Sequence, residues 1–208
     1  MKTTWIGRAL WIVGATLITS YGAARVYADA SRREGIQQFS HARASAGSVS
    51  NGPLAPDQSR WSASRIHAYA RSPTADAEVI PQALLHIPSI KLTVPVYSDT
   101  SDSTLNRGAG LIAGTASPDA VGNTGIAAHR DSFFRALKDV ALGDRIEVEH
   151  FSGTRAYRVS ALYIVDPGDL RPLAQTQHSV LTLVTCYPFY YVGSAPQRYI
   201  VRAVALDP

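Results

Sequence analysis

The sequence contains one cysteine, Cys186, in 208 residues, so no disulfide can form within the chain. Charged residues make up only 17% of it, and the net charge of +4 is a mild excess. Arg32 and Arg33 are the only adjacent basic pair, and no block of five or more Lys and Arg occurs, which argues against a nucleic-acid partner. No repeat with a period of 20–50 residues is visible, so a solenoid is excluded as well.

Charge is also absent from residues 9–24, which Lys2 and Arg8 precede and Arg25 follows. As a helix this stretch is about 24 Å long, and apolar neighbours on both sides extend it toward the roughly 30 Å needed to cross a bilayer. We interpret residues 1–30 as a single-pass anchor in the cytoplasmic membrane. The alternative is a cleaved signal peptide, because residues 28–30 (Ala-Asp-Ala) fit a cleavage site. Either interpretation places the rest of the chain on the outer, periplasmic side.

Residues 31–80 are rich in Ser, Ala, Arg and Gly, a composition typical of a flexible tether. Within this tether, residues 57–71 form a candidate helix, because Asp57 can cap it and Trp61, Arg65 and Tyr69 share one face. Near residue 81 the sequence pattern changes to short apolar runs separated by turns. We therefore expect residues 81–208 to form the folded domain.

Seven apolar runs of this domain are expected to be strands, and several alternate between apolar and polar residues. Short helices are expected at residues 102–108 and 131–137. Many short strands at close spacing predict a mainly β fold, a closed barrel of about seven or eight strands. The seven runs are ALLHIP, LTVPVY, TGIAAH, DRIEVEHF, RAYRVSALYIVDP, SVLTLVTCYP and QRYIVRAVAL.

Three polar residues at strand ends stand out as candidate catalytic residues. Cys186 ends the apolar run that begins at Val180, and Arg198 begins the next strand, so an antiparallel return brings the two together. His129 likewise closes an apolar run. A guanidinium near a cysteine stabilises the thiolate or an oxyanion, and a cysteine nucleophile requires an imidazole. Taken singly, each is more often structural or solvent-exposed; in particular, most buried cysteines are inert.

Around these residues the sequence resembles the sortases, which are membrane-anchored cysteine transpeptidases. The resemblance lies in TLVTC (182–186), in APQRYIV with Arg198, and in AAHRDSFF with His129, and it extends over about residues 83–206. The continuation TCYPF and the short C-terminus look closest to class D-like sortases of Gram-negative bacteria. One departure is Ala128, where the family often has glycine.

The resemblance implies a role for each residue. Cys186 is the expected nucleophile, His129 the general acid and base, and Arg198 the oxyanion stabiliser, while Thr185 is expected to help bind the substrate carbonyl. The implied reaction cleaves an LPXTG-like sorting signal, forms a thioacyl intermediate on Cys186 and transfers it to an amine. The expected partners are therefore a protein bearing a sorting signal, an amine acceptor in the cell envelope and the membrane, with no nucleic acid.

Several other interpretations remain. L,D-transpeptidases place their cysteine in a His-Gly-Cys context, whereas this chain has Val184-Thr185-Cys186. Papain-like proteases place the cysteine before the histidine along the chain, the reverse of the order here. A membrane-tethered barrel that only binds or scaffolds predicts a buried Cys186 far from His129 and Arg198. The acidic residues follow no recognisable calcium-loop pattern, so we expect no metal and no cofactor.

Overall fold

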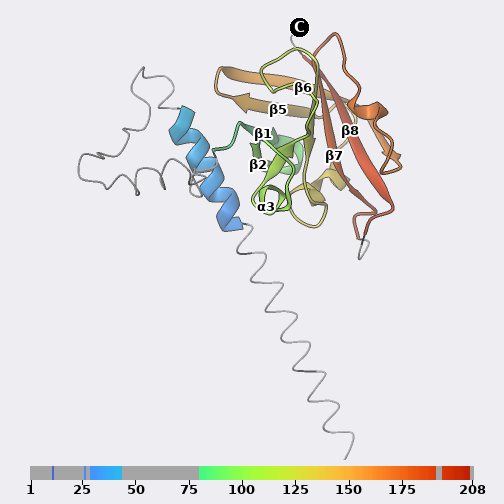
Figure 1. Ribbon diagram of the computed structural model, residues 1–208, viewed down its shortest axis with the longest axis horizontal. Coiled ribbons are helices and arrows are strands. Elements are labelled where there is room, and N and C mark those ends of the chain that lie inside the picture. The colour runs from blue at the N-terminus through green and yellow to red at the C-terminus, as the bar shows by residue number, and fades with distance from the viewer. Residues whose placement is uncertain (1–10, 12–25, 27–28, 44–79, 191–193, 207–208) are drawn as a thin grey trace, which may run out of the picture.

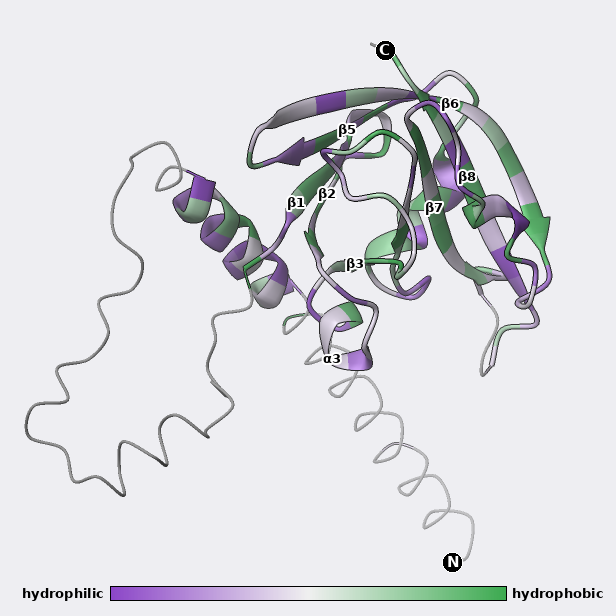
Figure 2. Ribbon diagram, turned by 45° about the horizontal axis from the view of Figure 1, so that its top comes forward, coloured by the Kyte–Doolittle hydropathy of each residue, from purple (hydrophilic) through white to green (hydrophobic). Residues whose placement is uncertain are grey.

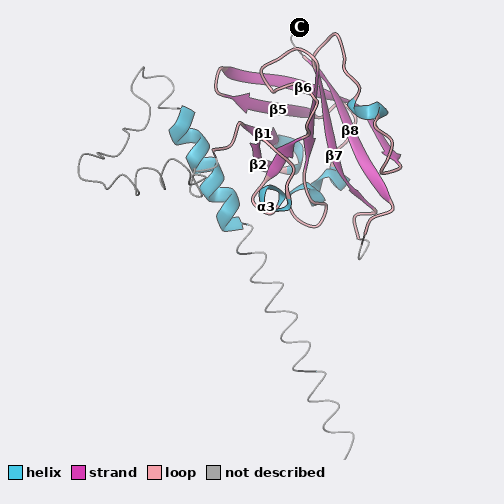
Figure 3. Ribbon diagram, in the orientation of Figure 1, coloured by secondary structure: helices cyan, strands magenta, loops and turns pink. Residues whose placement is uncertain are grey.

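The computed structural model describes residues 11, 26, 29–43, 80–190 and 194–206. Within them, eight strands close into a barrel in the order β1-β2-β3-β4-β7-β8-β6-β5 (Figures 1 and 3). Neighbours pair antiparallel except for β2 with β3 and β4 with β7, which are parallel. The strands are β1 Ala83–Ile87, β2 Leu92–Tyr97, β3 Ala109–Leu111, β4 Asn123–Ala127, β5 Arg145–His150, β6 Gly153–Val165, β7 Val180–Tyr187 and β8 Gln197–Ala205.

The expected mainly β class and closed barrel are confirmed, and the alternating runs behave as their pattern predicts. In β5, Ile146 and Val148 are fully buried in the core, while Glu147 and Glu149 point outward. The β5–β6 hairpin is also present, with His150 opposite Gly153. Strand β7 is apolar nearly throughout, and Figure 2 colours much of it green. A strand of this kind is buried on both faces over most of its length.

The eighth strand is β3, which is only three residues long and has no alternating pattern. It connects β2 to β4 and so completes the barrel wall. Gly110 makes this connection sterically feasible, because a Cβ atom there would lie 1.9 Å from the backbone oxygen of Asp99. The barrel therefore has the expected number of strands, but β3 was not among the seven segments predicted to be strands.

Both short helices exist but differ from their expected form. The first, α3, covers Asp102–Leu105, and the side chain of Ser101 caps it by accepting from the Thr104 N–H. The second, η2, covers Phe133–Asp139 and is a 3-10 helix. It buries Phe133, Phe134 and Leu137 against the barrel, so packing against the core decides its position. Two further 3-10 turns, η1 Pro88–Ile90 and η3 Arg171–Leu173, lie between strands.

A helix over residues 29–43 lies beside the barrel (Figure 1), in a region that the sequence analysis assigned to the flexible tether. Gly35 and Phe39 fix this helix on the barrel: both are buried, and they lie one helical turn apart. Phe39 packs on Phe151 with ring centroids 5.2 Å apart, and Arg43 pairs with Glu149 on β5. This part of the tether is therefore docked, while the candidate helix at 57–71 lies outside the described residues.

Among the described residues, none of the helices is both long and apolar enough to span a membrane. The expected anchor at residues 1–30 falls outside this set, apart from residues 11, 26, 29 and 30. The anchor, the alternative signal peptide and the domain limits at residues 30 and 80 stay predictions.

Candidate active site

The ends of three adjacent strands bring Cys186, Arg198 and His129 together. Cys186 on β7 is the direct partner of Arg198 on β8 in the antiparallel register. On the other side of β7, the parallel strand β4 ends with Ala127 beside Val184. The next residue continues this pairing, because the Ala128 N–H donates to the Val184 oxygen at 3.3 Å. His129 therefore follows at the level of Cys186.

All three side chains belong to the outer face of the barrel. Side chains alternate along a strand, and Leu183 and Val201 on these strands belong to the core, as does Ala128 in front of His129. Cys186, Arg198 and His129 are each partly exposed. The expectation of a buried Cys186, which the scaffold interpretation requires, is not met.

An open pocket of about 320 Å³ lies where these strands end, and the three predicted catalytic residues all line it. Four further residues line it that were not predicted. Arg130 and Asp131 follow His129 directly along the chain, and this proximity to a candidate catalytic histidine could have indicated them. Ser194 and Ala195 precede β8 and gave no such signal. The described lining is His129, Arg130, Asp131, Cys186, Ser194, Ala195 and Arg198.

Two backbone oxygens, one at the start of β8 and one just before it, hold the guanidinium of Arg198. Its Nη1 donates to the Gln197 oxygen at 3.0 Å and to the Ala195 oxygen at 3.3 Å. No carboxylate forms an ion pair with Arg198 among the residues that the structure describes. Its positive charge therefore remains available to an oxygen that develops negative charge in the pocket.

Thr185 makes a buried hydrogen bond within the protein. Its side chain is only 2% exposed, and its hydroxyl donates to the Ala128 oxygen at 2.8 Å. That bond ties the residue before Cys186 to the residue before His129. Thr185 is not among the described residues that line the pocket. The bond is a positioning contact, and the expected contact with a substrate carbonyl stays a prediction.

His129 is anchored by the chain that follows it. The Phe134 N–H donates to the His129 oxygen at 3.1 Å, and Phe133 and Phe134 are buried in the core. The remaining histidines of the described chain lie elsewhere. His86 contacts Thr93 and Glu149, and His150 contacts Ser152. His129 is the histidine that lines the pocket with Cys186.

Farther along the same outer face, a polar network holds η3 against β4, β7 and β8. Asn123 Nδ2 donates to the Pro172 oxygen at 2.8 Å and accepts at Oδ1 from the Thr182 hydroxyl at 2.7 Å. Arg202 Nη1 also donates to the Pro172 oxygen, at 3.2 Å. Asn123 and Thr182 are buried with their polar atoms paired, and Arg202 is partly buried beside them. The β6–β7 connection therefore covers this end of the face, while the Cys186 end stays open.

An aromatic cluster packs at the end of the barrel next to Cys186. Tyr199 stacks on Tyr187 with ring centroids 6.2 Å apart and meets Phe189 edge-on at 5.2 Å. Burial raises the pKa of the Tyr199 hydroxyl, and the neighbouring Tyr187 raises it further. The phenol is therefore neutral near pH 7, and the cluster contributes packing rather than charge beside the pocket.

Taken together, a thiol, an imidazole and a guanidinium in one open pocket can perform nucleophilic acyl transfer. The thiolate attacks a carbonyl, the imidazole exchanges protons with the leaving and entering groups, and the guanidinium stabilises the oxyanion. The pairing of Cys186 with Arg198 fixes two of these groups on adjacent strands.

Comparison with known proteins yields matches over the same part of the chain. The family model described as "Sortase domain" matches residues 85–206. Sortase D of Bacillus subtilis is 34% identical over 119 residues, which are 57% of this chain and 60% of that protein. The chain thus covers less than two thirds of this curated relative.

Solved structures agree on the fold. Sortase C1 of Streptococcus agalactiae, in a complex with MTSET, is 29% identical with a TM-score of 0.56, covering 61% of this chain and 67% of that one. A sortase D5 transpeptidase of Clostridium perfringens has a TM-score of 0.59 at 20% identity, covering 87% of this chain and 99% of that one. At that identity the likeness shows the fold alone.

Proposed function

Because the chain belongs to the sortase family, we propose that it is a cysteine transpeptidase with Cys186 as nucleophile, His129 as general acid and base, and Arg198 as oxyanion stabiliser. One observation carries the proposal: the three side chains line a single open pocket at the ends of β4, β7 and β8. A fold alone would not justify an activity, whereas these groups are the set that acyl transfer requires.

In the first half-reaction, the Cys186 thiolate attacks the carbonyl carbon of the scissile peptide bond. The new S–C bond pushes the carbonyl electrons onto oxygen, where Arg198 stabilises the negative charge. When the intermediate collapses, the C–N bond breaks and His129 gives its proton to the leaving amine. The products are a thioacyl-enzyme and a released peptide amine.

In the second half-reaction, an acceptor amine attacks the thioester carbonyl and His129 takes the amine's proton. Arg198 again stabilises the oxyanion, and the S–C bond breaks to return the Cys186 thiolate. A new amide replaces the one that was cleaved, so the net reaction is transpeptidation without an external energy source.

We further propose that the substrate is a protein with an LPXTG-like sorting signal and that the acceptor is an amine of the cell envelope. The predicted anchor at residues 1–30 places the enzyme at the cytoplasmic membrane with the barrel outside. The class D-like relationship agrees with the match to sortase D of B. subtilis, and a Gram-negative source stays a prediction from the sequence.

The test uses the full chain in detergent micelles, incubated with an LPXTG-type peptide and a panel of amines. Intact mass spectrometry is expected to show an acyl adduct in the wild type, none in Cys186→Ala, and release of the adduct to an amine. His129→Asn is expected to lose the reaction, while the matched control His178→Asn keeps it, because His178 lies in an exposed loop outside the pocket. The proposal would be contradicted if no combination of peptide and amine gave a product that depends on Cys186.

A further inference from the structure

A second pocket, of about 220 Å³, lies on the molecule between the helix at 29–43 and the turns η1 and η2. Its described lining is mixed: Ile90, Leu92, Phe133 and Ala136 are apolar, whereas Asp29, Arg32, Lys91 and Ser132 are polar or charged. None of these residues lines the pocket of Cys186. The proposed acyl transfer uses none of them.

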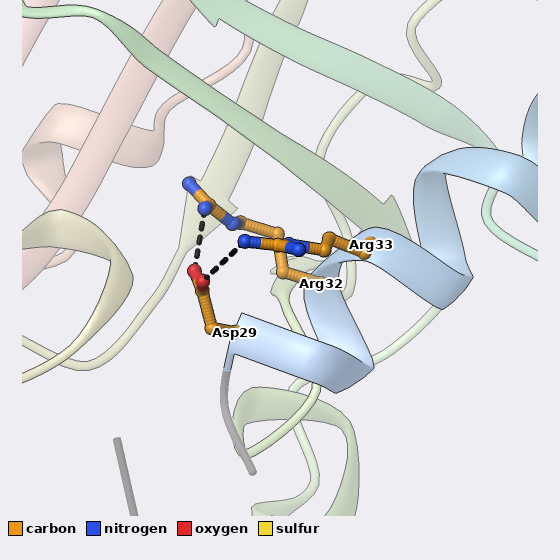
Figure 4. A network of polar contacts seen from close by, with 3 residues as sticks. All are labelled: Asp29, Arg32 and Arg33. Carbon is orange, nitrogen blue, oxygen red and sulfur yellow. Dashed lines mark hydrogen bonds and ion pairs between the residues drawn. The ribbon is translucent and has the colours of Figure 1, made fainter. Parts of the chain in front are cut away.

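The polar residues at this pocket carry an excess of positive charge. Figure 4 shows the guanidinium groups of Arg32 and Arg33 converging on the single carboxylate of Asp29, at 2.5 Å and 3.2 Å. Arg33 does not line the pocket, whereas Lys91 does, and Lys91 forms no ion pair with any residue that the structure describes. The lining therefore holds two cations, Arg32 and Lys91, and one carboxylate, Asp29, which leaves a net positive charge that suits an anionic ligand.

Lys91 adopts the left-handed conformation with φ of 52° as the C-cap of η1, where its N–H donates to the Pro88 oxygen at 3.1 Å. One polar atom beside it has no partner within the fold. The hydroxyl oxygen of Ser132 is buried and has no hydrogen-bond partner. A ligand oxygen in the pocket would accept from the Lys91 ammonium and, once the Ser132 side chain turns toward the pocket, from its hydroxyl, and phosphate oxygens accept such bonds well.

We propose that this pocket binds the phosphate of an anionic membrane lipid, with the headgroup phosphate at Arg32, Lys91 and Ser132 and the adjoining glycerol carbons on Ile90 and Phe133. The mixed lining supports a ligand that is anionic at one end and apolar at the other. The position supports a lipid, because Asp29 lies at the end of the predicted anchor at residues 1–30 and Arg32 shortly after it. Basic residues next to an anchor attract anionic headgroups.

The bound lipid would contact the segment that carries the candidate general base. Ser132 and Phe133 follow His129 by a few residues, and the Phe134 N–H is bonded to the His129 oxygen at 3.1 Å. A lipid at Ser132 therefore holds the barrel at the membrane through the same turn, η2, that anchors His129.

The experiment uses the full chain in micelles that contain phosphatidylglycerol and phosphatidylcholine in equal amounts and with the same acyl chains. Native mass spectrometry then counts the lipid that stays bound. The wild type is expected to retain phosphatidylglycerol in preference to phosphatidylcholine. Lys91→Asn, which suits the left-handed backbone, is expected to lower that retention about fivefold, the effect of one basic residue near an anionic headgroup. Ser132→Ala is expected to lower it without any change of charge.

Lys138→Gln is the matched control, because it removes one lysine charge from η2 at a position outside the pocket. It is expected to retain lipid as the wild type does. Equal loss in Lys138→Gln, or unchanged retention in both Lys91→Asn and Ser132→Ala, would overturn the proposal. Displacement of the lipid by glycerol 3-phosphate or inorganic phosphate at equal concentration would also overturn it, since the site would then bind free phosphate.

Discussion

Cys186 and Arg198 are opposite one another in the register of β7 and β8, on the outer face of the barrel. The pairing places a cationic group beside the sulfur, and two backbone oxygens orient the guanidinium. A cation in this place can act on the thiolate before reaction and on the oxyanion during it.

We expect Arg198→Ala to lower kcat/KM for transpeptidation by about 10²–10³-fold, the usual cost of removing one oxyanion stabiliser. Arg198→Lys should recover only part of this loss, because an ammonium cannot reproduce the planar fork of the guanidinium. Both are measured by steady-state assay with a sorting-signal peptide. The matched control is Arg158→Ala on β6, whose side chain is exposed and bonds Gly143 away from the pocket.

Near-wild-type activity in Arg198→Ala would contradict the proposed role. An equal loss of activity in Arg158→Ala would mean that the effect comes from the protein's net charge, because that variant removes the same charge far from Cys186.

Thr185 provides a second prediction, through its buried bond to the Ala128 oxygen. Thr185→Val removes the donor and leaves that carbonyl without a partner, a change that costs about 1–3 kcal/mol in free energy of unfolding. We also expect kcat to fall because β7 and the residue before His129 are no longer tied together. Thr185→Ser keeps the hydroxyl and should restore kcat.

The readouts are urea denaturation and the pH profile of kcat. A merely structural contact would lower stability in Thr185→Val without moving the pH profile, and that outcome would contradict the positioning role. If Thr185→Val kept kcat and raised only KM, the original expectation of a substrate contact would regain support.

The sequence allowed the strand ends at Cys186, Arg198 and His129 to be predicted because apolar runs that stop at a polar residue are local signals. The partnership of Cys186 with Arg198 needed only a short antiparallel return. By contrast, β3 has three residues and no alternation, and its place in the barrel depends on contacts with β2 and β4. Such non-local pairing leaves no periodic pattern in the sequence.

The helix at 29–43 was missed for a related reason. Its composition is polar, and Gly35 in its middle lowers its helix propensity. Gly35 is needed because a Cβ there would lie 2.5 Å from the Tyr97 hydroxyl and 2.9 Å from Pro95 Cγ. Tertiary packing on the barrel therefore overrides local preference. The Thr185 contact was missed similarly, since its acceptor is 57 residues away along the chain.

His86 makes stability depend on pH. Burial lowers its pKa below the ordinary 6.5, and the nearby Glu147 offsets this only in part. Thr93, Glu149 and, through Glu149, Arg43 also lie around it. A lowered folded pKa means that the unfolded chain binds the proton more readily. The resulting stability is present above pH 6.5 and is lost as the pH falls below that value toward the folded pKa.

We therefore expect the free energy of unfolding, measured with urea, to fall between about pH 7 and pH 5. His86→Gln should flatten part of this slope, and His150 should account for another part, because burial and the neighbouring Arg155 lower its pKa as well. His178→Gln is the control at an exposed loop position. A slope that is the same in His86→Gln and in the wild type would contradict the assignment to His86.

Phe39 tests whether the helix at 29–43 is a stable part of the folded unit. Its side chain is 1% exposed and packs on Phe151, and the truncation Phe39→Ala removes that contact. Loss of a buried phenylalanine costs about 3–5 kcal/mol in a core, and Phe39 is the larger of the two residues that this helix buries, the other being Gly35. We expect the helix to leave the barrel, so amide exchange over residues 29–43 should speed up while β7 and β8 stay protected.

Gln37→Ala, at an exposed position of the same helix, should leave exchange unchanged. Equal loss of protection across the whole barrel would instead show that the helix and the barrel unfold as one cooperative unit, and unchanged exchange in Phe39→Ala would show that other contacts hold the helix in place.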